Sequence, residues 1–159
     1  MEIYLLRHGI AEDRAPGGQD AERALTGEGK EKLRRVLRRA REAGVRPSLI
    51  LSSPYRRAVE TAAIAAEVLG YDGNVVKTRT LEPDASPHDC WDEIRKRAGE
   101  SAIVLASHEP LMSSLAAFLL ASPGLAVEMK KAALLRVDCD RAGPQPKFVL
   151  KWMLTPATA

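Results

Sequence analysis

Short apolar segments alternate with longer amphipathic ones along the whole chain. Runs rich in Ile, Leu and Val predict strands at about 2–6, 48–52, 75–78, 102–106, 133–138 and 147–153. Between most of them, apolar residues recur every three or four positions, as they do on one face of a helix. This alternation predicts an α/β fold with a mostly parallel sheet.

Two helices have clear start and stop signals. Thr26 is placed to cap a helix that ends at Gly44, since the threonine hydroxyl can accept from the first turn and glycine favours the end of a helix. Ser53 and Pro54 suit the cap and the first position of a second helix, which ends at Gly70. Both helices follow a predicted strand, as expected for βα units.

Turn-forming residues mark the other connections. Ser86 and Pro87 predict the start of a third helix. The sequence DRAGPQP, residues 140–146, joins the last two predicted strands and favours an antiparallel hairpin at the carboxyl end. The longest irregular stretch is AEDRAPGGQDAER, residues 11–23, and a loop of this length is typical of a lid or a binding loop.

Composition narrows the class of protein. Apolar residues make up 45% and charged residues 28% of the 159 positions, a balance typical of globular proteins. We expect a single domain over residues 1–159. The longest apolar runs are too short to cross a bilayer, so we expect no membrane association. Cys90 and Cys139 lie far apart, which indicates neither a disulfide framework nor a zinc site. A cytoplasmic protein is the default expectation.

The net charge of +3 is mild, and much of the excess lies in KEKLRRVLRRAR, residues 30–41. Apolar residues recur at helical spacing in this segment, so its cations fall on the opposite face. A solvated helix face is the simplest interpretation. A docking surface for an acidic partner is the alternative, and no motif supports nucleic-acid binding.

The informative polar residues follow three predicted strands. They are Arg7, His8 and Gly9 after the first, Ser53, Arg56 and Arg57 after the second, and Ser107, His108 and Glu109 after the strand at 102–106. In a parallel sheet the carboxyl ends lie along one edge, where such folds bind ligands. These side chains are therefore expected to converge.

Arginine and histidine together suit phosphate chemistry. The guanidinium of Arg57, in the first turn of its helix, and the free N–H groups of that helix would point at one anion. A neutral imidazole could attack phosphorus, and a protonated one could stabilise the phosphoryl oxygens. A structural role for His8 or His108 alone, or a metal site, is the competing interpretation. His88 lacks metal-ligand spacing and is expected on the surface, as is Arg56.

With these residues in view, the sequence resembles the histidine phosphatase superfamily, with its phosphoglycerate mutase-like fold, and within it the short SixA-type phosphohistidine phosphatases. The resemblance covers nearly the whole chain and is carried by LLRHGIA, RALTGEGKEKL, SSPYRRAVETA, ASHEPLMSSL and LKWMLTP. It implies a three-layer α/β/α sandwich with a mostly parallel central sheet and an antiparallel carboxyl-terminal strand. In SSPYRRAVETA, the family's arginine and threonine correspond to Arg57 and Thr61.

The resemblance implies roles for the catalytic residues. His8 would be the nucleophile that becomes phosphorylated, and Arg7, Arg57 and His108 would hold the phosphoryl group. No metal or organic cofactor would be needed. Gly9, Ser53 and Glu82 are expected to contact the substrate, and the resemblance implies that Arg23 lies near the mouth of the pocket.

One departure from the family concerns the acid. Many members carry a general-acid glutamate in an insert that is missing here, where TLEPDASPHD stands. Glu82 or Asp84 could donate the proton, or either could be a turn residue. Ser107 also stands where glycine is common.

The short chain implies an open site that can admit a protein surface, so a phosphorylated histidine-containing protein domain is the favoured substrate. A phosphorylated small molecule, hydrolysed by a phosphomonoesterase of the same superfamily, is the alternative. A non-catalytic phosphate-binding regulatory domain is the third possibility. We expect a monomer.

Overall fold

A mixed sheet forms the centre of the computed structural model, which describes residues 1–140 and 142–159. Its strands are β1 (Glu2–Arg7), β2 (Leu49–Ser52), β3 (Val76–Lys77), β4 (Ala102–Ser107), β5 (Leu134–Asp138) and β6 (Val149–Leu154). They lie in the order β3-β2-β4-β1-β5-β6. The central position of β4 and β1 explains why these strands are buried along nearly their whole length.

The predicted mixture of strand directions is confirmed. β4 pairs in parallel with β1 and with β2, and β2 pairs in parallel with β3. β5 is antiparallel to both β1 and β6. The reversed strand is thus β5, and β6 returns to the direction of β1. The expected hairpin is present, although its joint at 140–146 includes residue 141, which lies outside the described residues.

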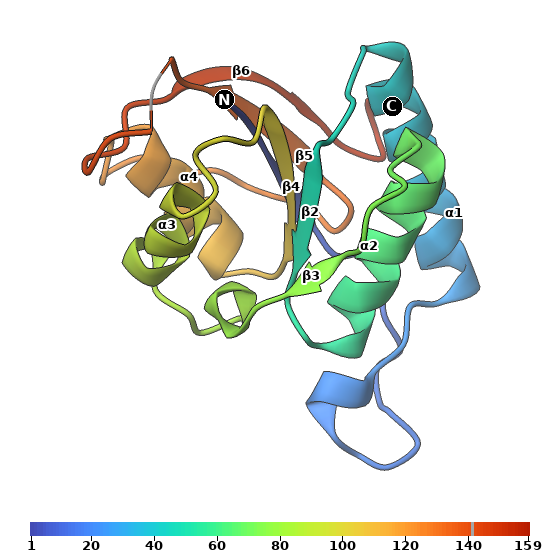
Figure 1. Ribbon diagram of the computed structural model, residues 1–159. Coiled ribbons are helices and arrows are strands. Elements are labelled where there is room, and N and C mark those ends of the chain that lie inside the picture. The colour runs from blue at the N-terminus through green and yellow to red at the C-terminus, as the bar shows by residue number, and fades with distance from the viewer. Residues whose placement is uncertain (141) are drawn as a thin grey trace.

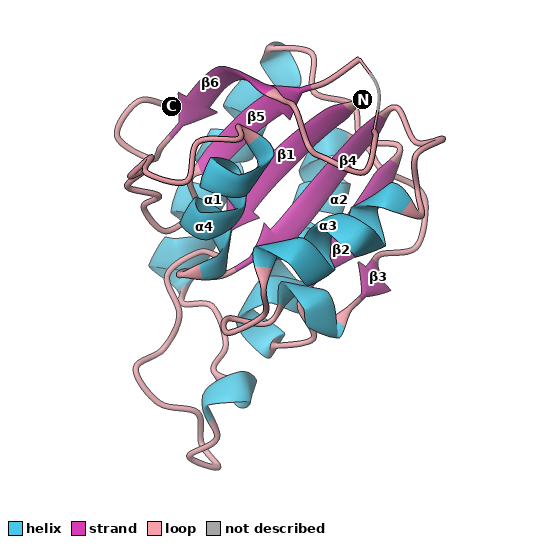
Figure 2. Ribbon diagram, turned by 90° about the vertical axis from the view of Figure 1, so that its left-hand side faces the viewer, coloured by secondary structure: helices cyan, strands magenta, loops and turns pink. Residues whose placement is uncertain are grey.

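Helices cover both faces of the sheet, as the three-layer prediction requires (Figures 1 and 2). They are α1 (Gly27–Glu42), α2 (Arg56–Leu69), α3 (Pro87–Arg95) and α4 (Leu111–Leu119). Two 3₁₀ turns, η1 (Asp20–Glu22) and η2 (Arg79–Leu81), lie in the connections. α1 and α2 cover one face, and α3 and α4 cover the other. The segment between β1 and α1 projects beyond this body, with η1 near its tip.

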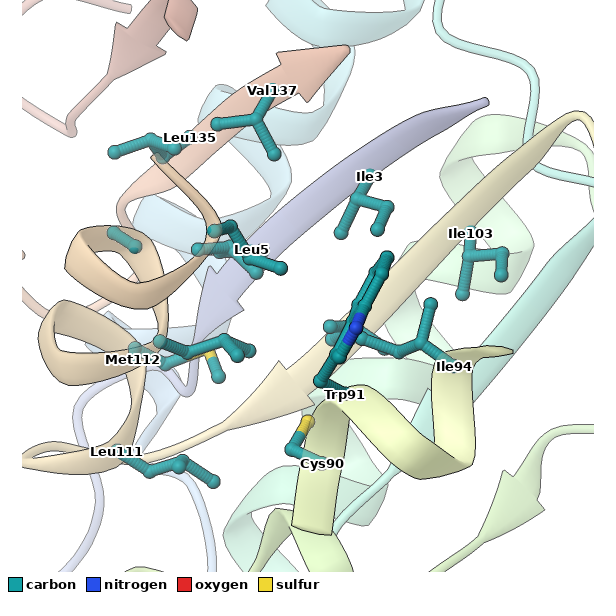
Figure 3. Close-up of a cluster of buried hydrophobic side chains, with 14 of the residues drawn as sticks. Ile3, Leu5, Cys90, Trp91, Ile94, Ile103, Leu111, Met112, Leu135 and Val137 are labelled. Atoms are coloured by element: carbon teal, nitrogen blue, oxygen red, sulfur yellow. The ribbon is translucent and has the colours of Figure 1, made fainter. Parts of the chain in front are cut away.

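Alternate residues of β1 enter two separate cores. Ile3 and Leu5 belong to the cluster under α3 and α4, where Trp91 is fully buried, and Figure 3 shows this packing. Tyr4 and Leu6 belong to the cluster under α1 and α2. This alternation is the two-residue period of a strand that is buried on both faces. β1 is thereby held rigidly up to the residue before His8.

Most of the predicted helix ends are confirmed. The Thr26 hydroxyl accepts from the backbone N–H of Gly29 at 2.9 Å, and the Ser86 hydroxyl accepts from that of Asp89 at 3.0 Å. Gly70 ends α2 in the left-handed conformation, at φ +73°.

The predicted start of α2 is wrong by two residues. The helix begins at Arg56 with Tyr55 at its cap, rather than at Pro54 with Ser53 at the cap. The Ser53 hydroxyl accepts from the backbone N–H of Tyr55 in a turn that precedes the helix. α1 likewise ends two residues before Gly44, which follows at φ +90°. Within the described part of the chain, no helix is long and apolar enough to cross a membrane.

Gly29 lets the start of α1 lie directly against the chain that follows His8. A Cβ at this position would collide with the backbone of Ile10. We predict that Gly29→Ala lowers the free energy of unfolding by about 1–3 kcal/mol, the usual cost of overpacking a tight site.

Gly27→Ala is the matched control, because a Cβ there meets no atom within 4 Å. Its free energy of unfolding should stay within about 0.5 kcal/mol of the wild type. Urea denaturation of both variants measures these values, and equal effects would contradict the close contact at Gly29.

Candidate active site

The pairing of β1 with β4 brings the two predicted histidines together. Arg7 and Ser107 are partners at the end of this parallel ladder, so the next residue of each strand lies at the same edge. The backbone N–H of His8 donates to the Ser107 carbonyl at 2.9 Å. The rings of His8 and His108 lie 5.1 Å apart between centroids, with their planes tilted by 59°. The predicted convergence of these two residues is present.

The hydrogen bonds of His8 fix its tautomer. Its Nδ1 lies 2.7 Å from the Gly9 carbonyl oxygen, which can only accept, so the proton is on Nδ1. Nε2 therefore carries the lone pair, and the Nε–H of Arg57 donates to it at 3.4 Å. His8 is only 6% exposed. The Nε2 of His8 thus lies beside a permanent cation.

Arg57 reaches this position from the first turn of α2. The side chain of Arg57 is buried. Hydrogen bonds link the backbone of Arg57 to the segment after β1. The hydroxyl of Thr61, one turn further on, donates to the Arg57 carbonyl at 2.7 Å and accepts from the backbone N–H of Gly9 at 3.2 Å. Thr61 therefore couples the position of Arg57 to that of Gly9, the residue directly after His8.

His108 is held by residues from the second strand end. Its Nε2 lies 2.8 Å from the hydroxyl of Ser53, the same hydroxyl that accepts from the backbone N–H of Tyr55. Its Nδ1 is buried and has no hydrogen-bond partner among the described residues. Sequence reasoning missed the contact of Tyr55, whose ring meets His108 edge-on at 5.1 Å and lies 5.1 Å from the Arg57 guanidinium carbon.

Both imidazoles are neutral at neutral pH in this arrangement. Burial lowers the pKa of His8 to about 4. The hydrogen bond to Gly9 opposes this shift, and the charges of Arg57 and Arg7 reinforce it. Burial, and then the nearby His8 and Arg57, lower the pKa of His108 to about 3. A bound anion would favour the protonated form of His108, since an opposite charge within a few ångströms raises the pKa of a histidine.

Arg7 lies at the same edge, held by the segment before β5. Its Nη1 donates to the Met129 carbonyl at 2.7 Å, while its Nε is buried without a hydrogen-bond partner among the described residues. The two predicted arginines therefore come from different elements, the end of β1 and the start of α2. Such a pair can hold a tetrahedral anion from two sides.

The loop at 11–23 contributes a carboxylate that sequence reasoning missed. Asp20 accepts from Arg57 Nη2 through its side chain at 3.2 Å and from Nη1 through its carbonyl at 2.9 Å. It also accepts from Arg23 Nε at 2.8 Å. Burial works against ionisation, but the Arg23 hydrogen bond and the Arg57 charge hold the pKa of Asp20 below its usual value. Arg23 thus reaches the site through Asp20.

The carboxylates expected near the site make their contacts elsewhere in this structure. Glu82 forms an ion pair with Arg79 at 3.3 Å. In residues 1–140 and 142–159, no carboxylate hydrogen-bonds to either His8 or His108. The assignment of Glu82 or Asp84 as the proton donor stays a prediction. The hydroxyl of Ser107 donates to the Leu81 carbonyl at 2.6 Å and ties η2 to the end of β4.

The two residues expected on the surface are there. The side chain of His88 is 73% exposed, and Arg56 pairs with Glu60 in solvent. Among the described residues, no group of three or more His, Cys, Asp or Glu side chains is arranged to hold a metal ion.

Comparisons with known proteins agree with this fold. Residues 3–82 match the family model of the histidine phosphatase superfamily (branch 1). An uncharacterized protein of Picosynechococcus is 34% identical over 97% of this chain and 99% of its own length. The chain belongs to the histidine phosphatase superfamily, which places it among phosphatases.

Solved structures show the same fold over nearly the whole chain. The protein histidine phosphatase SixA in complex with tungstate is similar at a TM-score of 0.88 and 24% identity, over 99% of this chain and 98% of that one. A SixA protein from Agrobacterium tumefaciens has a TM-score of 0.79 at 22% identity, over 98% of both chains. A mycobacterial glucosyl-3-phosphoglycerate phosphatase has a TM-score of 0.68 at 19% identity, over 94% and 96%.

The contact of Asp20 with Arg57 predicts a measurable effect on anion binding. Asp20→Asn removes a negative charge beside the anion pocket, so inorganic phosphate should inhibit aryl phosphate hydrolysis at a several-fold lower concentration, about 1 kcal/mol of binding. Glu22→Gln, in the same 3₁₀ turn, is the matched control and should leave this inhibition constant unchanged. Equal constants in the wild type and Asp20→Asn would show that the carboxylate does not oppose the bound anion.

Proposed function

We propose that this protein is a phosphatase that hydrolyses protein phosphohistidine through a covalent phosphohistidine intermediate on His8. The observation that carries the proposal is the state of His8: its Nδ1 is held by the Gly9 carbonyl, so the lone pair is on Nε2, where it accepts a long hydrogen bond of 3.4 Å from Arg57. This imidazole is neutral, oriented and next to a cation, which is what attack on a phosphorylated group requires.

In the first transfer, His8 Nε2 forms a bond to phosphorus. The substrate's imidazole, protonated on its other ring nitrogen, leaves as the bond from phosphorus breaks. The electron pair of that bond stays on the nitrogen, so the leaving group is a neutral imidazole. In the second transfer, water attacks phosphorus, the electron pair of the phosphorus–nitrogen bond returns to Nε2, and inorganic phosphate leaves. Each transfer moves one phosphoryl group, so no oxidant or metal is required to balance the reaction.

The other residues of the site would hold the phosphoryl oxygens. Arg57 and Arg7 supply guanidinium groups from two elements. His108 has a buried Nδ1 without a hydrogen-bond partner among the described residues. Once an anion raises the pKa of His108, the positive charge of its ring can stabilise the transferring phosphoryl group.

The hydrogen bonds of the two histidines support the substrate class. The carboxylate nearest to Arg57 is that of Asp20, and hydrogen bonding keeps it ionised. An alkoxide is a strong base and needs a proton donor to leave, whereas an imidazole leaves as a much weaker base. A site that offers no carboxylic acid to His8 or His108 within the described residues therefore suits a phosphorylated imidazole. The similarity to SixA supports the same class.

A phosphorylated small molecule is the second candidate. The similarity to the mycobacterial glucosyl-3-phosphoglycerate phosphatase favours it, since that protein has the same fold. The non-catalytic alternative is less well supported, because an anion-binding module does not need an oriented neutral imidazole beside the anion.

A side-by-side comparison tests the proposal. The purified protein is offered a histidine-containing phosphotransfer domain, phosphorylated chemically with phosphoramidate, and a panel of sugar and acid phosphates. We predict a kcat/KM for the phosphorylated domain that exceeds every value in the panel by about tenfold or more, since a neutral imidazole needs less help from an acid to leave than an alkoxide does.

His8→Ala is the control for both substrate classes. It should abolish turnover of the phosphorylated domain, of the panel and of an aryl phosphate. Its circular dichroism spectrum should stay that of the wild type. A higher kcat/KM for a member of the panel would reverse the order of the two candidates. Undiminished aryl phosphate turnover in His8→Ala would rule out the covalent mechanism.

A further inference from the structure

A cavity of about 650 Å³ lies beside the active site, on the face of the sheet that α1 covers. Its wall is formed by the first half of α1, the segment at 130–132 and the segment at 155–157. Arg7 also contributes to the wall, and the carbonyl that holds its guanidinium belongs to Met129, directly before the second of these segments. The cavity therefore adjoins the phosphate site.

The cavity is strongly cationic. Lys32 and Arg35 of α1 line it together with Lys130 and Lys131, while none of the described residues that line it is acidic. The charge of Lys131 also acts on His8, where it contributes to the lowered pKa of that imidazole. An anion bound in this cavity would thus lie close to the nucleophile.

The cations are available to an incoming ligand. Lys32 pairs with Glu28 at 2.9 Å and Lys130 with Glu128 at 2.8 Å, but these carboxylates are 66% and 77% exposed. Exposed pairs of this kind contribute little to stability and exchange partners readily. Arg35 is fixed differently, because its guanidinium donates to the Pro156 carbonyl at 2.6 Å.

The wall between the cations is apolar. Ile10, Ala132, Pro156 and Ala157 supply hydrophobic surface there. A ligand that matches this arrangement carries several carboxylates around an apolar side chain. Positive charge also continues outside the cavity, since the exposed Arg38 lies one turn beyond Arg35 on α1. An acidic protein surface can contact this whole area, whereas a small metabolite cannot.

We propose that this cation-lined cavity docks an acidic, partly apolar segment of the protein that carries the phosphohistidine, next to the phosphorylated residue. The inference rests on the proposed function and adds the surface by which the partner is recognised. Complementary charge at such a site accelerates productive encounter and orients the partner. Docking outside the phosphate pocket also explains how a site without a large insert can select one protein substrate.

Charge reversal tests the docking site. The double variant Lys32→Glu with Lys130→Glu reverses two of the cavity's cations. The matched double variant Lys30→Glu with Lys96→Glu makes the same charge change at exposed positions that do not line the cavity. For each protein, kcat/KM is measured with the phosphorylated phosphotransfer domain and with an aryl phosphate, and the ratio of the two values is compared.

We expect the ratio to fall by about tenfold or more in the cavity variant and to stay within about twofold of the wild type in the matched variant. Equal ratios in all three proteins would overturn the docking site and leave the proposed function intact. The cavity variant could also lose as much kcat/KM for a small bisphosphate substrate as it does for the phosphorylated domain. That result would make the cavity a subsite for a second phosphate and would overturn protein docking. If the wild type turns over the aryl phosphate but not the phosphorylated domain, the proposed function fails and the docking site fails with it.

Discussion

The parallel pairing of β1 with β4 is the constraint on which the site depends. The two strands are buried on both faces, and their ladder ends at the pair formed by Arg7 and Ser107. His8 and His108 follow at once, so their separation is set by the spacing between two strands rather than by loop conformation. A one-residue shift of register would turn one imidazole to the other face of the sheet.

Around this fixed pair, charge is distributed so that each imidazole stays neutral while cations surround it. Arg57 donates to the Nε2 of His8, and the Asp20 carboxylate balances Arg57 from the other side. Desolvation and these cations together keep protons off both histidines. The negative charge of an incoming phosphoryl group would balance the positive charges of the arginines. The site is therefore suited to bind a phosphorylated substrate.

The fold and the main site residues could be predicted from the chain because they depend on local patterns. Strand hydrophobicity and the positions of Arg7, His8, Arg57 and His108 at strand and helix ends define the layers and one edge of the sheet. The role of Asp20 could not be predicted in this way, since its contact with Arg57 spans 37 residues and depends on how the loop folds. The start of α2 could not be predicted either, because the Ser53 hydroxyl accepts from the N–H of Tyr55 in a turn that comes before the helix.

The central claim is that the Nε2 of His8 carries the phosphoryl group during turnover. The direct measurement is to quench a reacting mixture into alkaline denaturant, in which phosphohistidine survives, and to identify the labelled residue by peptide mass spectrometry and its nitrogen by phosphorus NMR. We expect phosphate on the Nε2 of His8, because the Gly9 carbonyl holds the other nitrogen. Phosphate on the Nδ1 of His8, or on His108, would contradict it.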